Sequence, residues 1–542
     1  MNRKKESSYS FFFKKFIRPH TPTIIILLVL DILGILFGLV TPLLSKYLID
    51  DVFSGKRVEL FGYILLGIAG IYLISAISSY FSSYIGGKLN LTLFRDVTGE
   101  TFETLQFASL KETQKMKIGD MLSRTMSNAH SAIQIFSSIL PQFFISVIQI
   151  IGPFVIMFFL NNQLTLIVMA PVLLFVLSSA FFGKRIKKRQ RKSLDKIASV
   201  HSFLKEVLST LPLVKVFGLE KWSRDKFRGQ MDDYYDSSLS VTKTHSLSGS
   251  VNSLIHSLPM LLVVGFGGTM AIKGDLTIGT YVAFMGYVGL FFSPISGLSI
   301  LWTQYKSSSA AFDRVNELFE LEQDDKGSEA LFLKKGVVKA RDVWFSYNGR
   351  TIFQGFNATF QNGRNYIVGD NGTGKTTILK LLCNLYPIER GSITIDGQDI
   401  SKVRRGGLRK NISMVFSEAY LFDVTIYESI HIGNISASEE EVINAAKLAR
   451  VHDFIMSLPQ KYETNVGEAG LRLSSGEKQK IALARAILKD SPIMLLDEVT
   501  KSIDAESRRS INETITSLKD KTIIIVTHDM NEIDNGKVIH LG

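Results

Sequence analysis

The 542-residue chain is too long for a single ordinary domain, and its 46% hydrophobic content is high for a water-soluble protein. Its only cysteine, Cys383, excludes an internal disulfide and a cysteine-cluster metal site, and we expect it to be a small core residue. The formal charge of +12 leaves three kinds of partner to distinguish: nucleic acid, a membrane surface, or the lipid around the basic loops of a membrane protein.

Six apolar runs close to the length that crosses a bilayer occupy the N-terminal part of the chain. A basic and aromatic segment precedes the first run and is expected to form an interfacial helix. The first run is too long for a secretory signal and lacks a small-residue cleavage site, so we interpret it as a retained span. The six runs cover 24–44, 60–84, 135–160, 164–182, 254–272 and 278–298.

The links between these runs alternate in length and charge. The links at 161–163 and 273–275 are short, whereas those after the second and fourth runs are long. The second long link contains the basic run GKRIKKRQRK at 183–192, and the N-terminus is also basic, so the positive-inside rule places both in the cytoplasm. Because these basic runs flank apolar spans and lack interleaved aromatic residues, we expect no nucleic-acid partner.

The composition and periodicity of the sequence change after the sixth apolar run. The chain becomes charged, loses its apolar periodicity and enters a linker near 322–330. From about residue 336, β-rich runs such as NYIV, IMLL and TIIIVTHD alternate with helical ones. This alternation is typical of an α/β domain with a largely parallel sheet.

The stretch GDNGTGKTT at 369–377 lies between a predicted strand and a predicted helix and fits the phosphate-loop pattern G-x-x-x-x-G-K-[ST]. Its glycines let backbone N–H groups turn inward around phosphates at a helix N-terminus. Lys375 is expected to reach the β- and γ-phosphates of ATP, and the Thr376 hydroxyl to bind Mg²⁺. The candidate ATP-binding residues here are Gly369, Asp370, Asn371, Gly372, Thr373, Gly374, Lys375, Thr376 and Thr377.

A second motif, PIMLLDE, predicts a buried strand that ends in Asp497 and Glu498. Alone, such a pair could be an ordinary strand end. Behind a phosphate loop it indicates hydrolysis: Asp497 is predicted to hold Mg²⁺, directly or through water, and Glu498 to polarise the attacking water.

The residues between and around these motifs resemble ABC transporters. LSSGEKQKIALARAIL at 473–488 resembles the family signature, usually LSGGQ, and YETNVGEAG at 462–470 resembles the segment before it in exporters. TKSID at 500–504 is similar to the D-loop, and His528 in VTHD matches the switch histidine. Tyr347 in DVWFSY matches the aromatic residue that stacks on adenine.

The membrane half shows the same resemblance. The segments 98–133 and 206–220 resemble the two long cytoplasmic loops of six-span exporters. The resemblance implies an all-α polytopic membrane domain of six transmembrane helices with long cytoplasmic extensions, followed by an α/β P-loop ATPase domain. The expected domains are an interfacial segment 1–20, the transmembrane domain 21–310, a linker 311–335 and the ATP-binding cassette 336–542.

The resemblance also implies a mechanism that needs two chains. Two cassettes would sandwich two ATP molecules, each phosphate loop facing the partner's signature, here Ser474, Ser475, Gly476 and Glu477. Closure would push on the cytoplasmic loops and turn the spans outward. Hydrolysis through Glu498, with His528 holding the γ-phosphate, would reset them.

The sequence departs from the family pattern at several positions. Ser417, followed by Glu418, replaces the Q-loop glutamine and is expected to reach Mg²⁺ only through water. Within the signature, Ser475 replaces a glycine and Glu477 the last glutamine, and Lys501 takes the place of a D-loop serine. Heterodimeric exporters can carry altered signatures, so one half of a heterodimer is an alternative to the homodimer that we expect.

The predicted function is an ATP-driven exporter, a translocase of the bacterial plasma membrane with its termini and ATPase domain in the cytoplasm and with ATP and Mg²⁺ as cofactors. We expect a peptide or amphipathic small molecule as cargo and, because only 1–20 precede the first span, no peptidase domain. A lipid flippase, an ATP-gated channel and a regulatory ATPase are the alternatives. Asp31, within the first span, is a candidate cargo or cation contact, or else a residue that reaches interfacial water.

Overall fold

The computed structural model describes residues 8–324, 327–347, 349–467, 470, 472–501, 503–530, 533–534 and 536–541. Contacts within the chain divide it into two compact units. The helical unit comprises 1–100 and 122–317, and the strand unit comprises 101–121 and 318–542. Ser502, in the D-loop-like segment, lies outside the described residues.

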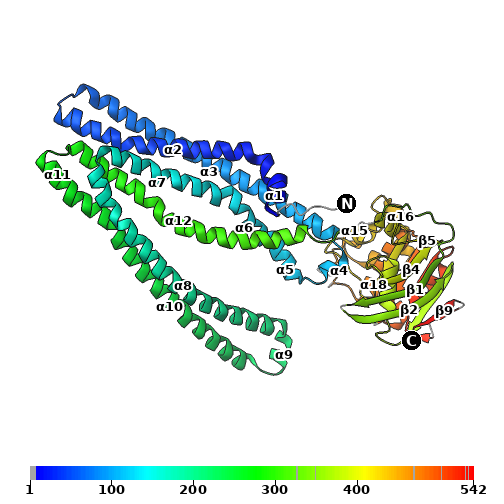
Figure 1. Cartoon of the computed structure of the whole chain (residues 1–542). Coiled ribbons are helices and arrows are strands. Elements are labelled where there is room, and N and C mark those ends of the chain that lie inside the picture. The colour runs from blue at the N-terminus through cyan, green and yellow to red at the C-terminus, as the bar shows by residue number, and fades with distance from the viewer. Residues whose placement is uncertain are drawn as a thin grey trace. The chain divides into compact units, whose positions relative to one another are not determined.

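Six helical rods that are long and apolar enough to cross a membrane confirm the six predicted spans (Figure 1). Each rod extends past its apolar run, because the sequence keeps helix-forming residues where it becomes polar. The rods run over Ser10–Ser54, Glu59–Phe107, Ile118–Leu160, Asn162–Ser209, Glu220–Lys273 and Ile278–Phe319. Their α-helical parts and connections are α1 (Ser8–Phe12), α2 (Thr21–Tyr47), α3 (Glu59–Phe107), α4 (Leu110–Thr113), α5 (Ile118–Ser123), α6 (Ala129–Gln134), α7 (Leu140–Leu160), α8 (Asn162–Ser209), α9 (Leu211–Val216), α10 (Glu220–Leu262), α11 (Gly268–Lys273) and α12 (Ile278–Phe319).

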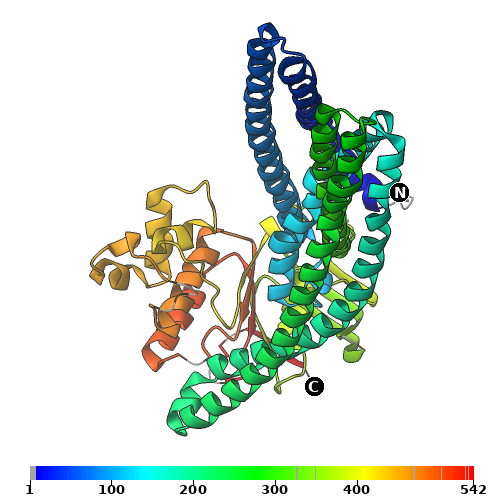
Figure 2. The ribbon, with the colours of Figure 1, turned by 90° about the vertical axis from the view of Figure 1, so that its left-hand side faces the viewer.

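The second long link is built as a helical extension. Figures 1 and 2 show α8 and α10 side by side up to α9, and the basic run 183–192 lies within α8. Arg189 donates to the Ser240 carbonyl at 3.0 Å, and Lys196 pairs with Asp233. Polar contacts therefore hold the two helices together beyond the apolar part of the spans.

The core of the helical unit lies between α7, α8 and α12. Met157, Leu164, Val168 and Phe284 are fully buried there. Tyr287 of the same cluster donates its hydroxyl to the carbonyl of Leu39 at 2.5 Å, which ties α12 to α2. This packing fixes α2, α7 and α12 relative to one another.

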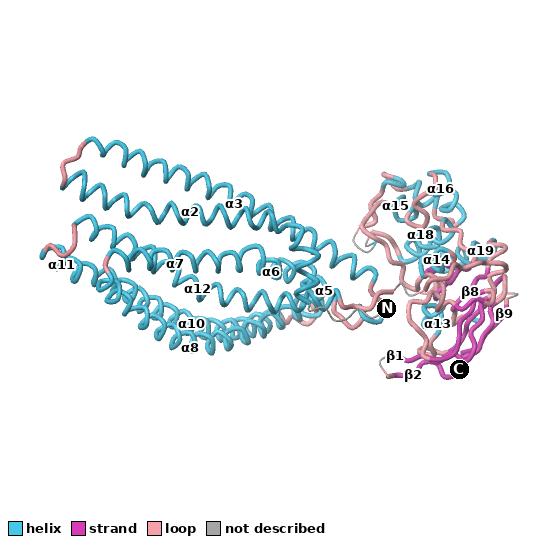
Figure 3. The backbone as a smooth tube through the Cα atoms, turned by 45° about the horizontal axis from the view of Figure 1, so that its top comes forward, coloured by secondary structure: helices cyan, strands magenta, loops and turns pink. Residues whose placement is uncertain are grey.

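The strand unit contains two sheets, coloured magenta in Figure 3. The five-stranded sheet has the order β6-β7-β8-β3-β9 with parallel pairs, which confirms the predicted parallel sheet. An antiparallel sheet of order β2-β1-β4-β5 was not predicted. The strands are β1 (Val338–Tyr347), β2 (Arg350–Phe360), β3 (Gly363–Gly369), β4 (Arg390–Ile395), β5 (Gln398–Asp399), β6 (Ile412–Val415), β7 (Ile493–Asp497), β8 (Thr522–Val526) and β9 (Lys537–Leu541).

Helices and loops cover the parallel sheet, so β7 and β8 are buried along their whole lengths. Such strands read as continuous apolar runs, as IMLL and TIIIV do. Cys383 is buried in this unit as expected, and burial raises the pKa of its thiol to about 12. The helices here are α13 (Lys375–Leu382), α14 (Arg405–Lys410), α15 (Ile426–His431), α16 (Glu439–Leu448), α17 (His452–Ser457), α18 (Ser475–Leu488) and α19 (Ala505–Ser517).

Residues 101–121 pack with the strand unit, although the sequence places them in a loop of the predicted domain 21–310. The N–H of Ser109 donates to the carbonyl of Glu322 at 2.7 Å, and the N–H of Asp324 donates to the carbonyl of Phe107 at 2.7 Å. Backbone pairing with the chain beyond α12 therefore attaches residues 101–121 to the strand unit.

Asp396 fixes the entry into β1. Its carboxylate accepts hydrogen bonds from four consecutive backbone N–H groups: Oδ2 from Lys334 at 2.7 Å, Lys335 at 3.0 Å and Gly336 at 2.9 Å, and Oδ1 from Val337 at 3.0 Å. Burial by itself would raise the pKa of Asp396, but the four N–H groups together hold it below its ordinary value. The carboxylate is thus a stabilising acceptor for the end of the linker.

We expect Asp396→Ala to lower the free energy of unfolding of the strand unit by about 1–2 kcal/mol, because four N–H groups lose a charged acceptor. Since folding lowers the pKa of Asp396, its stabilisation is complete above the pKa of the unfolded carboxyl and is lost as pH falls through the folded pKa. At pH 7, a thiol-reactive dye reports the melting midpoint through buried Cys383; circular dichroism extends the comparison to acid pH. Asp423→Asn, at an exposed position, is the control for charge. A difference between wild type and Asp396→Ala that did not shrink in acid would contradict this role.

Candidate active site

The functional loops meet at one edge of the parallel sheet. β3, β8, β7 and β6 are neighbours, and the segment that follows each strand emerges on the same side. Val526 is paired with Asp497 and with Ile367, and Leu496 with Val415. The phosphate loop, the turn with His528, the Asp497–Glu498 pair and the loop with Ser417 therefore follow adjacent strands.

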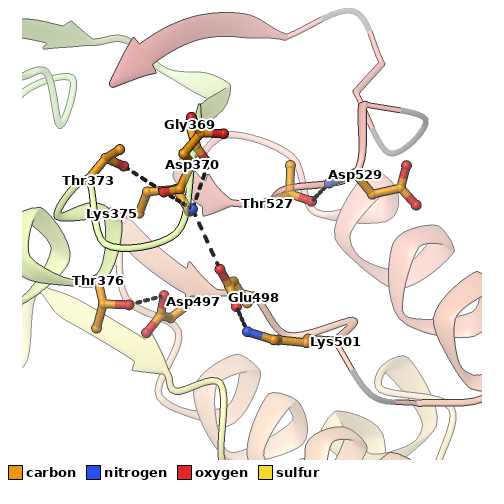
Figure 4. A network of polar contacts seen from close by, with 10 residues as sticks. All are labelled: Gly369, Asp370, Thr373, Lys375, Thr376, Asp497, Glu498, Lys501, Thr527 and Asp529. Carbon is orange, nitrogen blue, oxygen red and sulfur yellow. Dashed lines mark hydrogen bonds and ion pairs between the residues drawn. The ribbon is translucent and has the colours of Figure 1, made fainter. Parts of the chain in front are cut away.

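The phosphate loop connects β3 to α13 and is closed by its own lysine (Figure 4). Lys375 Nζ donates to the carbonyls of Gly369 at 2.7 Å and Asp370 at 3.0 Å, and the Thr373 hydroxyl donates to the Asp370 carbonyl at 2.9 Å. The Lys375 side chain is only 5% exposed. Its ammonium is thus held across the loop, where phosphate oxygens can replace the carbonyls.

Gly374, the last residue before Lys375, is required at its position for two reasons. Its φ of +97° lies in the left-handed region, which other residues rarely adopt. A β-carbon would also come within 2.7 Å of Ile352 Cγ2 and 2.9 Å of Phe353 Cζ. The glycine spacing of the motif therefore has a direct steric basis here.

The predicted metal ligands Thr376 and Asp497 lie in contact. The Thr376 hydroxyl donates to Asp497 Oδ1 at 2.9 Å, and Asp497 is 1% exposed. Burial raises the pKa of Asp497; the Thr376 hydrogen bond opposes this, and the charge of Glu498 adds to it. A buried carboxylate beside a hydroxyl fits Mg²⁺, which prefers oxygen ligands and binds through one or two protein groups plus substrate phosphates. The described residues contain no cluster of three or more His, Cys, Asp or Glu side chains suited to a metal.

Glu498 lies between two lysines (Figure 4). Its Oε1 is 3.9 Å from Lys375 Nζ, and its Oε2 accepts a hydrogen bond from Lys501 Nζ at 2.7 Å. This hydrogen bond and the charge of Glu498 raise the pKa of Lys501. The backbone of Glu498 adopts φ +45°, a sparsely populated conformation that clusters at functional sites, and its N–H donates to the carbonyl of Val526 at 3.0 Å.

The contact of Lys501 with Glu498 was not predicted. The sequence showed only that Lys501 departs from the D-loop pattern. Glu498 and Lys501 are three residues apart, and the turn after β7 brings their side chains together, with the N–H of Lys501 donating to the carbonyl of Glu498 at 3.0 Å. The sequence signal that could have predicted this contact is the spacing, because Lys501 lies three residues after Glu498.

Tyr347 ends β1 within an aromatic cluster. Its ring centroid is 4.8 Å from that of Phe345 and 5.2 Å from that of Tyr386, and burial raises the pKa of Tyr347. A cavity of about 290 Å³ opens beside it. Its polar lining includes Lys111, Gln114 and Lys115 from the segment 101–121, which sequence reasoning did not connect with this site.

The signature residues lie at the start of α18, and two of them, Ser474 and Glu477, bond to each other. The Ser474 hydroxyl accepts from the Glu477 N–H at 3.3 Å, and Glu477 Oε2 accepts from the Ser474 N–H at 2.7 Å, which is a capping box. A β-carbon at Gly476 would lie 2.7 Å from Ser507 Oγ and 3.1 Å from Ser507 Cβ, so the Ser507 side chain would have to shift. The glutamate that departs from the family signature thus completes the start of the helix, with Ser475 as its first residue.

The Ser417 loop is held through its backbone. Gln479, which is 4% exposed, donates to the carbonyls of Ser417 at 2.6 Å and Phe416 at 3.1 Å. The Ser417 side chain itself is exposed, as is that of His528 in the turn after β8. The network in Figure 4 therefore joins Lys375, Thr376, Asp497 and Glu498, while Tyr347, Ser417, His528 and the signature lie outside it.

Comparison with known proteins agrees with this arrangement. The family model described as "ABC transporter transmembrane region" matches residues 24–295, and the one described as "ABC transporter" matches 353–501. A relative from Bacillus subtilis (strain 168), "Putative multidrug export ATP-binding/permease protein YgaD", is 30% identical over 552 residues, covering 98% of this chain and 95% of the relative. A protein of the same description from Staphylococcus aureus (strain NCTC 8325 / PS 47) is 30% identical over 551 residues, covering 97% and 95%.

A solved structure also matches over nearly the whole length. "Structure of a bacterial Atm1-family ABC exporter with ATP bound" superposes with a TM-score of 0.81 at 25% identity, covering 96% of this chain and 94% of that one. The two family models follow one another in a single chain, as the predicted order of domains requires. The chain therefore belongs to the ABC transporter family, as a six-span half-transporter of the exporter type with an ATP-binding cassette in the same chain.

Proposed function

We propose that the protein is an exporter that hydrolyses ATP with Mg²⁺ and moves a peptide or amphipathic small molecule out of the bacterial cytoplasm by alternating access in a dimer. The observation that carries the proposal is the contact network of Lys375, Thr376, Asp497 and Glu498 in a chain that also has six membrane-spanning rods. The names of the relatives and of the ATP-bound structural neighbour support it. The cassette would lie in the cytoplasm on the side of the basic run.

The dimer is proposed because one chain supplies one phosphate loop and one signature, which lie on different helices and do not share a hydrogen-bond network. In the capping box the Ser474 hydroxyl is the acceptor, so its proton can be donated toward a phosphate from a partner cassette, and the N–H of Gly476 lies in the first turn of α18. A homodimer is favoured since the hydrolytic residues are all in place in this chain. A heterodimer remains the alternative, because of the altered signature.

Each residue of the network then has a role in hydrolysis. Lys375 exchanges its two loop carbonyls for phosphate oxygens, and Thr376 with Asp497 holds the metal, which when bound neutralises charge on the phosphates. Glu498 accepts the proton of the attacking water. Because Lys501 already occupies one oxygen of that carboxylate, Lys501 restrains the base before reaction.

Glu498→Gln should lower ATP turnover by about 10²-fold or more while ATP still binds, because the amide cannot accept the proton of water but leaves the phosphate loop intact. Phosphate release from the full chain in lipid, together with binding of a fluorescent nucleotide, measures the two effects separately. A variant that hydrolysed ATP at nearly the wild-type rate would exclude Glu498 as the base.

Lys501→Ser should raise basal turnover by about two- to tenfold, because the carboxylate of Glu498 is released from its ion pair. Lys501→Arg keeps a cation at this position and is the matched control, expected to stay near the wild-type rate. Initial rates at saturating ATP distinguish this rise in turnover from a change in nucleotide affinity. A fall in rate for Lys501→Ser, with Lys501→Arg unchanged, would instead make Lys501 a positioning residue that hydrolysis needs.

The purified chain alone in lipid should form an active homodimer, and Ser417→Gln should change its turnover by less than about threefold, because the loop is anchored by its backbone. Gln479→Leu, which removes that anchor, should lower turnover more than Ser417→Gln does. Dimerisation is measured by cross-linking in the bilayer and turnover by phosphate release. A chain that is inert with Mg·ATP until a different half-transporter is added would establish the heterodimer.

A further inference from the structure

A cavity of about 390 Å³ lies between α2, α7 and α12, within the membrane-spanning part of the helical unit. Asp31, Gly34, Ile35 and Gly38 of α2 line it, and their spacing places them on one face of the helix. A β-carbon added to Gly34 or Gly38 would meet no atom within 4 Å. These glycines therefore leave space that larger side chains would fill.

The cavity combines apolar walls with a few polar groups. Ile35, Leu39, Ile145 and Leu290 supply much of the apolar surface. The polar side chains in its lining are those of Asp31, Gln142, Gln149 and Ser293. Small-molecule sites have this composition and volumes of about 300–1,000 Å³, whereas a single ion needs far less space.

Asp31 is the charged side chain among the residues that line this cavity. Its Oδ1 accepts a hydrogen bond from the Ser82 hydroxyl at 2.6 Å. Among the described residues, no lysine, arginine or histidine forms an ion pair with it. Asp31 lies seven residues beyond Ile24, where the apolar run begins, which is about 10 Å along the helix. An acidic side chain at such a place is costly and indicates a functional site.

We propose that this cavity binds the exported cargo, and that the cargo is an amphipathic organic cation whose charge pairs with Asp31. The proposal rests on the export function proposed above and specifies its substrate class. The two glutamines can bond to polar groups of the cargo, and the apolar walls cover its hydrocarbon part. A bare divalent metal fits poorly, because Asp31 is the only metal-binding carboxylate, imidazole or thiolate in the lining.

The test uses the full chain in lipid nanodiscs without nucleotide, with two probes of similar shape. Tetraphenylphosphonium is a monovalent cation, and triphenylphosphine oxide is neutral. Asp31→Asn should weaken binding of the cation by about tenfold or more and change binding of the neutral probe by less than about twofold, because only the charge is lost. Gly34→Leu should weaken both probes, since the side chain enters the cavity. Equilibrium dialysis measures the affinity of wild type and of each variant for both probes.

Asp51→Asn is the matched control, because Asp51 lies in the same rod but outside the cavity, near Arg57 at 4.0 Å. It should leave both affinities unchanged. The proposal is overturned if wild type does not bind the cation, if Asp31→Asn binds it as wild type does, or if Asp31→Asn weakens both probes equally. Unchanged binding of the cation by Asp31→Asn is the result expected if Asp31 only exchanges a proton or reaches interfacial water.

Failure of the cargo class and failure of export are distinguishable. Inside-out vesicles are assayed for ATP-dependent accumulation of both probes. Accumulation of the neutral probe, with no binding of the cation, would overturn the cargo class and keep the export function. Binding of the cation in nanodiscs, with no ATP-dependent accumulation of either probe, would keep the site and contradict export.

Discussion

The parallel pairing of β3, β8, β7 and β6 is the constraint on which the candidate active site depends. Parallel strands end at the same edge, so each adds its following segment to a common surface. The register places Asp497 opposite Val526, and Val526 opposite Ile367, which brings the acid pair and the phosphate loop to opposite sides of β8. Segments more than a hundred residues apart in sequence then meet through the Thr376–Asp497 hydrogen bond. A slip of one residue in any of these pairs would turn a catalytic side chain to the other face of the sheet.

The acidic side chains at this edge of the sheet lie beside lysines of the same chain before ATP binds. Asp497 and Glu498 lie next to Lys375 and, for Glu498, Lys501. Asp497 is buried, and its hydrogen bond from Thr376 offsets part of the cost of burying a carboxylate. Each of these partners is one that phosphates, a metal or water can replace. The side-chain charges are therefore paired without ligand, in contacts that phosphates, a metal or water could take over.

The sequence predicted the six spans, the parallel sheet, the phosphate loop and the acid pair, because each has a local pattern: apolar length, strand and helix alternation, or glycine spacing. It did not predict the contacts that depend on packing. The position of residues 101–121 follows from backbone pairing with residues beyond α12, and the cavity beside Tyr347 follows from that position. The hydrogen bonds of Gln479 to the Ser417 loop join α18 to the end of β6, and no local pattern in either segment predicts them.

Asp497, which is buried, and Asp31, which is half-buried, have different partners for their carboxylates in the two units. Asp497 has a hydroxyl donor and a lysine nearby, and these partners offset part of the cost of burying its charge. Asp31 has one hydroxyl donor, from Ser82, and faces a cavity in an apolar environment where solvation is weaker. A charge that the fold leaves uncompensated is most stable when a ligand of opposite charge is present. The contrast in partners therefore supports the proposals made above: a metal-binding role for Asp497 and recognition of a cationic ligand for Asp31.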